Sequence, residues 1–366
     1  MRRRDFLRGA AAVSGVLVLG NSEHPSICAA ESTSPAALPE VQPGRLPQWH
    51  GFNLLEKFMM HNNRVFVEDD FRMMAEWGFN FARLPMDYRC WTDPEKPDQA
   101  DEKVLAEIDT AVELGEKYGV HINLCLHRAP GYTVARPAET LDLWTSEEAQ
   151  RQFDLQWSRF ARRYRGIPST RLSFDLVNEP AKVSNEDYAK VVRRVVAAIR
   201  AVDPDRLIIA DGNNYGRIPV FEIADLGVGQ STRGYDPFTL THYQASWVGG
   251  ADKWPEPTWP VRAWGRLEDR DWIARERIAP WKRLAEKGVG VHVGEWGVYN
   301  KTPHDVTLAF MRVVLDLWKE AGFGWSLWNL RGSFGILDSS REDVAYEDFR
   351  GKKLDRKMLE LLRAYV

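Results

Sequence analysis

Short apolar runs alternate with amphipathic segments along the chain from residue 50 onward. Runs of this length match buried strands, and the longer patterns between them match helices that cover a sheet. The strand-like runs are residues 50–55, 80–86, 121–127, 171–178, 206–211, 238–243, 290–296 and 324–330. Helical patterns occupy residues 69–77, 102–118, 146–164, 185–202, 272–287, 305–321 and 354–365. Gly78, Gly119, Gly288 and Gly322 follow helical patterns, which predicts that helices end there.

This alternation predicts a (β/α)8 TIM barrel in a single α/β domain. Strands separated by helices pair in parallel through right-handed crossovers. Eight such units in about 315 residues fit a fold that takes ~250 residues plus insertions. A doubly wound open sheet is the alternative, but no Gly-rich phosphate-binding loop follows any of the strand-like runs. Residues 244–271 form one oversized connection, and a loop of that length is usually functional.

The N-terminal residues have the composition of an export signal rather than of a folded domain. Residues 1–30 combine the charged stretch MRRRDFLR with the apolar stretch GAAAVSGVLVLG and resemble a twin-arginine signal. The apolar stretch is shorter than the ~20 residues that span a bilayer, although an uncleaved membrane-tethering helix is an alternative. Residues 31–47 are Pro- and Ala-rich and predict a linker, which leaves residues 48–366 as the folded domain. We expect export to the periplasm or the exterior of a bacterium, and no membrane association once the signal is removed.

Charge and cysteine content narrow the function classes. A net charge of −3 and a pI near 6.3 give no basic surface for nucleic acid. The 15 Trp residues exceed what core packing needs, which favours a sugar-binding or interface function for some of them. Cys28, Cys90 and Cys125 show no metal-ligand spacing. We expect Cys90 and Cys125 to be buried thiols, with a bridge between them as the alternative.

Polar and aromatic residues gather at the ends of the predicted strands. Catalytic groups of a (β/α)8 barrel stand at the C-terminal ends of its strands. The residues at these ends, in chain order, are Arg83, His127, Asn178, Glu179, His242, Tyr243, Glu295, Trp325 and Trp328. Each alone could be an ordinary edge residue, but six of eight strands deliver such a group to one rim.

Glu179 and Glu295 follow buried strands that lie across the barrel from each other. A carboxyl pair can cleave a glycosidic bond, because one group protonates the leaving oxygen while the other attacks or activates water. The same pair could bind Mg²⁺. A metal site would need further Asp or His ligands, whereas the rim offers mostly hydrogen-bond donors such as Arg83, Asn178 and His242. We therefore favour sugar chemistry and expect no metal or cofactor.

The ordered set of rim residues resembles a family. The chain is similar to retaining glycoside hydrolases of family 5, the cellulase family, over roughly residues 48–365. The family set runs Arg, His, Asn-Glu, His and Tyr, Glu, then Trp. Its counterparts here are Arg83, His127, Asn178-Glu179, His242, Tyr243, Glu295 and Trp328. Trp328 is preferred over Trp325 because WNLRGSFGILDS resembles the ending of the family's eighth strand.

The resemblance implies a division of labour among these residues. Glu179 would be the general acid/base and Glu295 the nucleophile, with Arg83 and the Tyr243 hydroxyl stabilising the charge of Glu295. Asn178 would bind the sugar 2-hydroxyl and Trp328 the sugar face. His127 and His242 would bind hydroxyls or support the carboxylates, with a neutral core histidine as the alternative for each.

The substrate implied is a carbohydrate, and a β-glucan is the leading choice. β-Mannan, β-1,3-glucan cleaved by an exo-acting enzyme, and small β-glucosides are alternatives on the same fold. A non-catalytic carbohydrate-binding barrel is an alternative from another class, against which the presence of both glutamates argues. We expect a monomer. Trp144, Trp247, Trp254, Trp259 and Trp264 fall in predicted loops on the same rim, where some could stack on neighbouring sugars.

Overall fold

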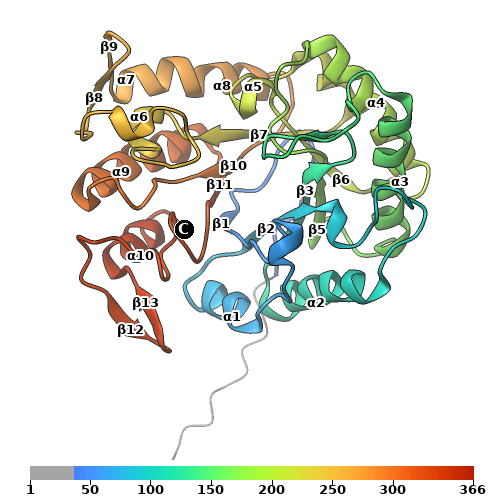
Figure 1. The fold of residues 1–366 in the computed structure, drawn as a ribbon, viewed down its shortest axis with the longest axis horizontal. Helices are drawn as coiled ribbons and strands as arrows, with labels where there is room; N and C mark the ends of the chain where they lie inside the picture. The colour runs from blue at the N-terminus through green and yellow to red at the C-terminus, as the bar shows by residue number, and fades with distance from the viewer. Residues whose placement is uncertain (1–36) are drawn as a thin grey trace, which may run out of the picture. The chain divides into compact units, whose positions relative to one another are not determined.

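Parallel strands close into a barrel in the part of the chain that the structure describes, residues 37–366 of this computed structural model. Each barrel strand pairs with the next in chain order, and the last returns to pair with the first, so the TIM-barrel prediction is confirmed. Helices surround the strands (Figure 1). The eight barrel strands are β1 (His50–Asn53), β2 (Phe81–Asp87), β3 (His121–Ala129), β5 (Leu172–Asp175), β6 (Leu207–Asp211), β7 (Gly229–Gly234), β10 (Val291–Trp296) and β11 (Gly324–Leu327).

The helices begin and end largely where local sequence signals predict. The Ser146 hydroxyl accepts a hydrogen bond from the Ala149 amide and caps the following helix, and Gly119 and Gly322 end helices in the left-handed conformation. The predicted helix 272–287 contains a π-helical turn, Ala274–Ile278, between two α-helical parts. The helices are α1 (Glu68–Glu76), α2 (Glu102–Tyr118), α3 (Glu147–Arg163), α4 (Asn185–Arg200), α5 (Asn213–Gly216), α6 (Phe238–Thr241), α7 (Arg270–Ile273), α8 (Ala279–Ala285), α9 (His304–Ala321) and α10 (Arg356–Arg363).

One predicted strand is wrong. Residues 238–243 contain the short helix α6, and the sixth barrel strand is β7, with the sequence GQSTRG. β7 is entirely buried although all of its residues are polar or glycine. Its polar side chains find buried partners: the Gln230 amide, for example, exchanges two hydrogen bonds with the backbone of Val220. A hydrophobicity pattern cannot recognise a strand that is buried through polar pairing.

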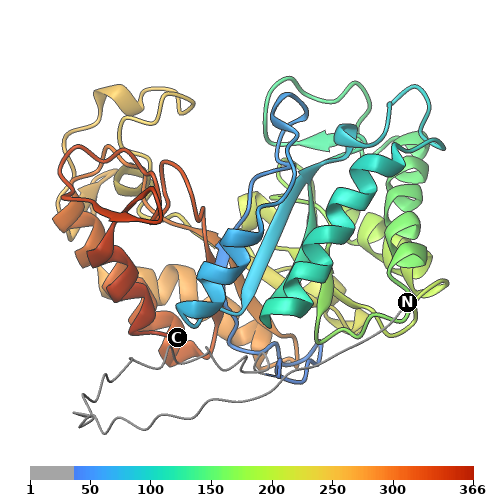
Figure 2. The ribbon, with the colours of Figure 1, turned by 90° about the horizontal axis from the view of Figure 1, so that it is seen from below.

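Five further short strands lie in the connections between and after the barrel strands of residues 37–366. The long connection 244–271 carries the hairpin β8–β9, and β4 extends the end of β3. Figure 2 shows the gold segment that holds β8 and β9 at the same end of the barrel as the loop that holds β4. The short strands are β4 (Tyr132–Thr133), β8 (Val261–Ala263), β9 (Arg266–Glu268), β12 (Glu347–Phe349) and β13 (Lys352–Leu354).

Aromatic rings fill the N-terminal end of the barrel. Trp49 stacks on His121 with ring centroids 4.0 Å apart, and Phe81 lies parallel to the same imidazole. His121 is fixed further by contacts of its two ring nitrogens with the Thr170 carbonyl and the Ser173 hydroxyl. Leu46 packs into this cluster, so the end of the predicted linker 31–47 covers the barrel floor. The predicted signal peptide, residues 1–30, lies outside the described residues.

Within residues 37–366, no helix is both long and apolar enough to cross a bilayer. Cys90 and Cys125 are buried free thiols, as expected, and are not bridged.

Candidate active site

Glu295 projects into the barrel mouth from a bulge in β10. Val293 pairs with Thr232 and Glu295 pairs with Arg233, so Gly294 has no partner on β7. Such a bulge turns the strand and redirects the side chain that follows it. A side chain at position 294 would collide with the Ser231 hydroxyl and come within 3.0 Å of Arg233 Nη1. Glycine is therefore the residue that permits this arrangement.

Glu179 stands four residues beyond the end of β5, in an uncommon backbone conformation. Its φ is 50°, a left-handed value that few residues other than glycine adopt. The Glu179 amide donates to Asp211 Oδ2 at 2.8 Å, and its carbonyl accepts from the Tyr132 hydroxyl at 2.7 Å. These bonds, from β6 and β4, hold the backbone so that the carboxyl group faces the barrel mouth, where its side chain keeps 16% of its surface exposed.

Arg83 is a fully buried cation beneath the two glutamates. Its Nη1 donates to Glu295 Oε1 at 2.6 Å and its Nε donates to Asp175 Oδ2 at 2.8 Å. Its Nη2 donates to Asn178 Oδ1 at 3.0 Å. The structure therefore brings Arg83, Asn178 and Glu295 together as the sequence predicted, and it adds Asp175.

Arg233 and Asp211 also belong to this network, and neither is among the site residues predicted from the sequence. Arg233 Nε donates to Glu179 Oε1 at 3.1 Å, and its Nη2 lies 3.5 Å from Glu295 Oε1. The same guanidinium pairs with both carboxylate oxygens of Asp211. Asp211 is the last residue of β6, and a carboxylate at the end of a buried strand is the same sequence feature that identified Glu295. Asp211 could therefore have been predicted as a site residue. Arg233 was hidden because β7 was assigned to the wrong residues.

The tyrosine that reaches Glu295 is Tyr235, not Tyr243. The Tyr235 hydroxyl donates to Glu295 Oε2 at 3.2 Å, directly after β7. The Tyr243 hydroxyl instead accepts a hydrogen bond from the Gln244 side chain at 3.0 Å. The predicted contact of Tyr243 with Glu295 is thus wrong, and the error follows from the misplaced sixth strand.

His242 lies beside the site rather than at a strand end. Its ring packs edge-to-face on Tyr235 with centroids 5.1 Å apart and stacks on Phe238. Burial and, to a smaller extent, nearby Arg217 lower the pKa of His242 to about 3, so the imidazole is neutral. It supports the tyrosine that contacts Glu295.

His127 and Trp328 form one wall of the site. Their rings stack with centroids 5.6 Å apart, and Phe58 packs edge-to-face on both. His127 Nδ1 is buried without a hydrogen-bond partner and lies 4.0 Å from Glu295 Oε1. Burial, with Arg83 and Arg233, holds the pKa of His127 well below its usual value, so the ring is neutral. Trp325 is buried in β11, which leaves Trp328 as the half-buried ring at the mouth.

The two glutamates have different electrostatic surroundings. Burial and the neighbouring Glu295 carboxylate raise the pKa of Glu179 to about 7, against the opposing charge of Arg233. Glu295 accepts hydrogen bonds from Arg83 and Tyr235 on its two oxygens. A carboxyl group that keeps its proton near neutrality beside one held by donors is the arrangement that acid-assisted displacement needs.

Among the five predicted rim tryptophans, Trp144, Trp254 and Trp259 are half-buried, whereas Trp247 and Trp264 are exposed. Trp144 packs on Tyr132, and Trp259 packs on Phe310. Trp247 is 57% exposed and packs edge-to-face on Tyr299, close to His242. Trp264 is 66% exposed at the turn of the β8–β9 hairpin. Trp247 is thus an exposed ring that lies beside His242, which in turn packs on Tyr235.

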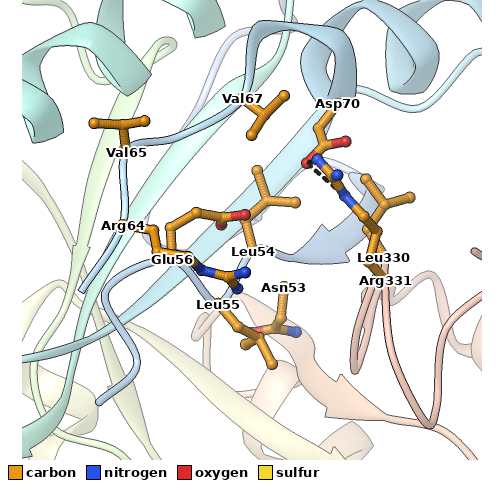
Figure 3. Close-up of a pocket in the computed structure, with 10 residues that line it drawn as sticks. All are labelled: Asn53, Leu54, Leu55, Glu56, Arg64, Val65, Val67, Asp70, Leu330 and Arg331. Atoms are coloured by element: carbon orange, nitrogen blue, oxygen red, sulfur yellow. Dashed lines mark hydrogen bonds and ion pairs between the residues drawn. The ribbon is translucent and has the colours of Figure 1, made fainter. Parts of the chain in front are cut away.

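A cavity of about 150 Å³ lies between the segments that follow β1 and β11 (Figure 3). Asn53 lines it and accepts a hydrogen bond from Arg83, which joins the cavity to the charge network. Glu56 and Asp70 each present a buried carboxyl oxygen without a partner, and Arg331 pairs with Asp70. The cavity therefore offers both acceptor and donor atoms to a hydroxyl-bearing ligand.

Metal-ligand clusters are absent from this region as far as the structure describes it. Among residues 37–366, no group of three or more His, Cys, Asp or Glu side chains is arranged to hold a metal ion. The buried carboxylates are paired instead with the guanidinium groups of Arg83 and Arg233.

Two carboxyl groups at the C-terminal mouth of a parallel barrel, one with a raised pKa and one that accepts hydrogen bonds from Arg83 and Tyr235, are the arrangement of a barrel glycosidase. Residues 40–333 match the family model for Cellulase (glycosyl hydrolase family 5). The chain belongs to glycosyl hydrolase family 5 and hydrolyses β-glycosidic bonds in O-glycosyl compounds.

Relatives and solved structures agree with this membership. The chain is 25% identical to Endoglucanase C of Acetivibrio thermocellus over 312 residues, which covers 78% of this chain and 90% of the relative. It is 26% identical to Cellodextrinase A of Ruminococcus flavefaciens, covering 70% and 75% of the two chains. A solved glycoside hydrolase is 42% identical, with a TM-score of 0.83 over 87% of this chain and 99% of that one. Endoglucanase Cel5A of Thermotoga maritima, 21% identical with a TM-score of 0.71 and coverage of 86% and 97%, shares the fold.

Proposed function

We propose that the chain hydrolyses a β-linked glucan with retention of anomeric configuration, with Glu179 as general acid/base and Glu295 as nucleophile. The observation that carries this assignment is the asymmetry of the pair. Glu295 accepts from Arg83 at 2.6 Å and from Tyr235 at 3.2 Å, whereas Glu179 has one guanidinium contact and a pKa raised to about 7. A nucleophile needs the first environment and an acid needs the second.

In the first step Glu295 attacks the anomeric carbon while Glu179 protonates the departing glycosidic oxygen. Asn178 is held by Arg83 and Arg233 through its carbonyl oxygen, while its amide nitrogen is buried without a partner. That nitrogen is free to donate to the sugar 2-hydroxyl, a contact that strengthens in the transition state. In the second step Glu179 takes a proton from water, which attacks the anomeric carbon and releases Glu295.

The remaining residues bind the sugar in this proposal. Trp328 offers a flat apolar face to the ring beside the cleaved bond, and neutral His127 offers a hydrogen-bonding edge. Tyr235 replaces Tyr243 as the tyrosine of the site, and His242 supports it. The names of the relatives, an endoglucanase and a cellodextrinase, favour a β-1,4-glucan as substrate.

The decisive experiment is hydrolysis of a polysaccharide panel by wild type and Glu295→Ala. We expect cleavage of β-glucan by wild type and loss of nearly all turnover in the variant. Near-wild-type turnover by Glu295→Ala would refute the assignment of Glu295 as nucleophile. If wild type cleaves mannan or β-1,3-glucan and not β-1,4-glucan, the proposed substrate is wrong. NMR of the first-formed anomer tests retention, because an inverted product excludes the covalent intermediate.

The two candidate tyrosines make a matched pair of variants. We expect Tyr235→Phe to lower kcat/KM about tenfold or more, since a hydrogen bond to a charged group contributes about 1.5–3 kcal/mol. Tyr243→Phe should stay close to wild type. The opposite ranking would show that the tyrosine assignment is wrong.

We further propose that residues 1–30 direct export through a twin-arginine pathway and that the mature protein is monomeric. The charged and apolar composition of this segment supports the first proposal. N-terminal sequencing of the exported protein, with Arg3→Lys and Arg4→Lys as export-deficient variants, tests it. Light scattering of the mature protein tests the second.

A further inference from the structure

Arg233 occupies the place where the family resemblance leads one to expect a histidine. The resemblance predicts His and Tyr at the end of the sixth strand, and that strand is β7. Tyr235 follows β7 and contacts Glu295, but β7 contains no histidine and delivers Arg233 to the site instead. The nearest histidine along the chain, His242, lies beyond α6 and does not contact either glutamate through any hydrogen bond or ion pair of the described residues.

The guanidinium of Arg233 is held on every nitrogen. Its Nε donates to Glu179 Oε1 at 3.1 Å, and its Nη2 donates to Asn178 Oδ1 at 2.9 Å. Its Nη1 donates to Asp211 Oδ1 at 3.1 Å and to the Ser231 hydroxyl at 3.0 Å. A planar fork fixed at this many points cannot turn away from Glu179.

This geometry decides which oxygen of Glu179 carries the proton. Oε1 accepts from a cation, so a proton on that oxygen would face the Nε–H donor directly. The proton therefore belongs on Oε2, the oxygen without a protein partner. The position of Arg233 thus leaves Oε2 as the oxygen that carries the acidic proton.

The charge of Arg233 also bears on the second half of the reaction. Formation of the glycosyl-enzyme neutralises Glu295, which leaves Arg233 and Arg83 as the nearest cations to Glu179. An arginine keeps its charge at every working pH, whereas a histidine at this place could lose it. Ionised Glu179, the form that takes a proton from water, is then stabilised.

We propose that Arg233 is a positioning residue for both steps: its Nε–H places the acidic proton of Glu179 on Oε2, and its fixed charge favours ionised Glu179 in the glycosyl-enzyme. The inference rests on the proposed function of Glu179. In the first step the Oε2 proton moves to the glycosidic oxygen as the Glu295–carbon bond forms and the carbon–oxygen bond to the leaving group breaks. In the second step a water oxygen bonds to the anomeric carbon, its proton moves to Glu179, and the bond to Glu295 breaks.

The negative charge of Asp211 partly offsets the positive charge of Arg233 near Glu179. Asp211 pairs with Arg233 and also accepts from the Glu179 amide, so it opposes the effect of Arg233 on the Glu179 carboxyl. The titratable and charged groups around the carboxyl, from all the elements that pack against it, are Arg83, His127, Tyr132, Asp175, Asp211, Arg233, Tyr235 and Glu295. Only Arg233 and Arg83 are permanent cations among them.

The test compares two variants, Arg233→Gln and Asp211→Asn, that should shift the alkaline limb of the kcat/KM–pH profile in opposite directions. Arg233→Gln removes the cation and should move the alkaline limb of the kcat/KM–pH profile upward by about one unit, because an adjacent opposite charge shifts a carboxyl by one to three units. Asp211→Asn leaves Arg233 unopposed and should move the same limb downward. Arg233→Lys keeps the charge and should leave the limb in place while kcat falls, since the Nε contact is lost.

A second kinetic readout isolates the deglycosylation step. With an aryl glycoside that has a good leaving group, breakdown of the glycosyl-enzyme limits kcat and requires ionised Glu179. Arg233→Gln should therefore lower kcat at pH 5 about tenfold relative to wild type and much less at pH 8. A loss that is equal at all pH values, or limbs that do not move in folded variants, would mean that Arg233 is only structural and would overturn the proposal.

A direct titration separates this inference from the proposed function. Carbon-13 NMR of the Glu179 carboxyl, identified by its absence in Glu179→Gln, should show its pKa raised in Arg233→Gln and lowered in Asp211→Asn. If wild type cleaves no glucan while these shifts occur, the proposed function fails and the charge relation stands. If glucan is cleaved and the carboxyl titrates identically in all three proteins, the inference on Arg233 fails alone. Should Arg233→Gln not fold, the downward shift in Asp211→Asn decides the matter.

Discussion

The bulge at Gly294 allows a sharp test of how the nucleophile is positioned. A methyl group at this position would meet the Ser231 hydroxyl and lie 3.0 Å from Arg233 Nη1, in a part of the barrel with no free space. Forcing a methyl into such packing costs about 1–3 kcal/mol. Displacing the following carboxyl by a fraction of an ångström to an ångström can lower turnover about 100-fold. Gly294→Ala should therefore fold, with kcat reduced by roughly two orders of magnitude.

The expected loss of stability is small by comparison. For a domain of this size the unfolding entropy is about 0.7 kcal/mol/K, so a loss of about 1–3 kcal/mol lowers Tm by roughly 1–4 °C. Differential scanning calorimetry and steady-state kinetics on a soluble oligosaccharide measure the two effects on the same preparation. Gly249→Ala is the matched control, because a methyl there meets nothing within 4 Å.

A second substitution identifies the colliding group. Ser231→Ala removes the hydroxyl that the new methyl would strike, so the double variant Gly294→Ala/Ser231→Ala should recover a large part of the lost turnover. Turnover of Gly294→Ala within twofold of wild type would refute the reasoning that the bulge sets the position of Glu295. A double variant no better than the single one would show that Ser231 is not the obstacle.

Three further predictions concern pH and substrate binding. The pKa of Glu179 is raised to about 7, and the acid must be protonated, so kcat/KM should fall as pH rises above about 7; a flat profile to pH 9 would contradict this. Burial lowers the pKa of His121 to about 3 and that of His50 to about 4, so the folded state keeps both neutral while the unfolded chain binds protons below about 6.5. The contribution of the two neutral imidazoles to the free energy of unfolding is then fully present above pH 6.5. Below pH 6.5 the free energy of unfolding should fall by about 1.4 kcal/mol per pH unit for each histidine. Urea unfolding at pH 7 and pH 5 measures this fall, and His121→Asn should make it smaller. Trp247→Ala should raise KM roughly tenfold if this ring stacks on a sugar, while Trp264→Ala, at the turn of the β8–β9 hairpin, should not; equal effects would refute a specific platform at Trp247.

Much of the barrel could be predicted because most of its strands are apolar runs bounded by turn signals. β2, β3 and β10 were found in this way to within a few residues. β7 was missed because its burial depends on polar pairing, as between Gln230 and the Val220 backbone. The apolar run 238–243 predicts a strand by its hydrophobicity, whereas in the structure it contains α6.

The carboxyl pair was visible in the sequence because Glu179 and Glu295 end or follow apolar runs. The residues that hydrogen-bond to them could not be predicted in the same way, because a local sequence pattern carries no information on hydrogen bonds between distant segments. Arg233 lies 54 residues from Glu179, and Asp211 lies 32 residues from it. With β7 placed correctly, the end of that strand would have pointed to both Arg233 and Tyr235.

The span of the Arg83 contacts has a consequence for how the chain assembles. This one guanidinium bonds to Asp175 and Glu295, which lie 92 and 212 residues further along the chain, so it joins β2 to β5 and to β10. Until the last strands dock, Arg83 and the carboxylates remain in water, and their desolvation is compensated only when the ring closes. Contacts of such long range form slowly because loop closure precedes any gain. We therefore expect barrel closure to be a late, rate-limiting event, and fragments ending before β10 to remain open chains without a formed site.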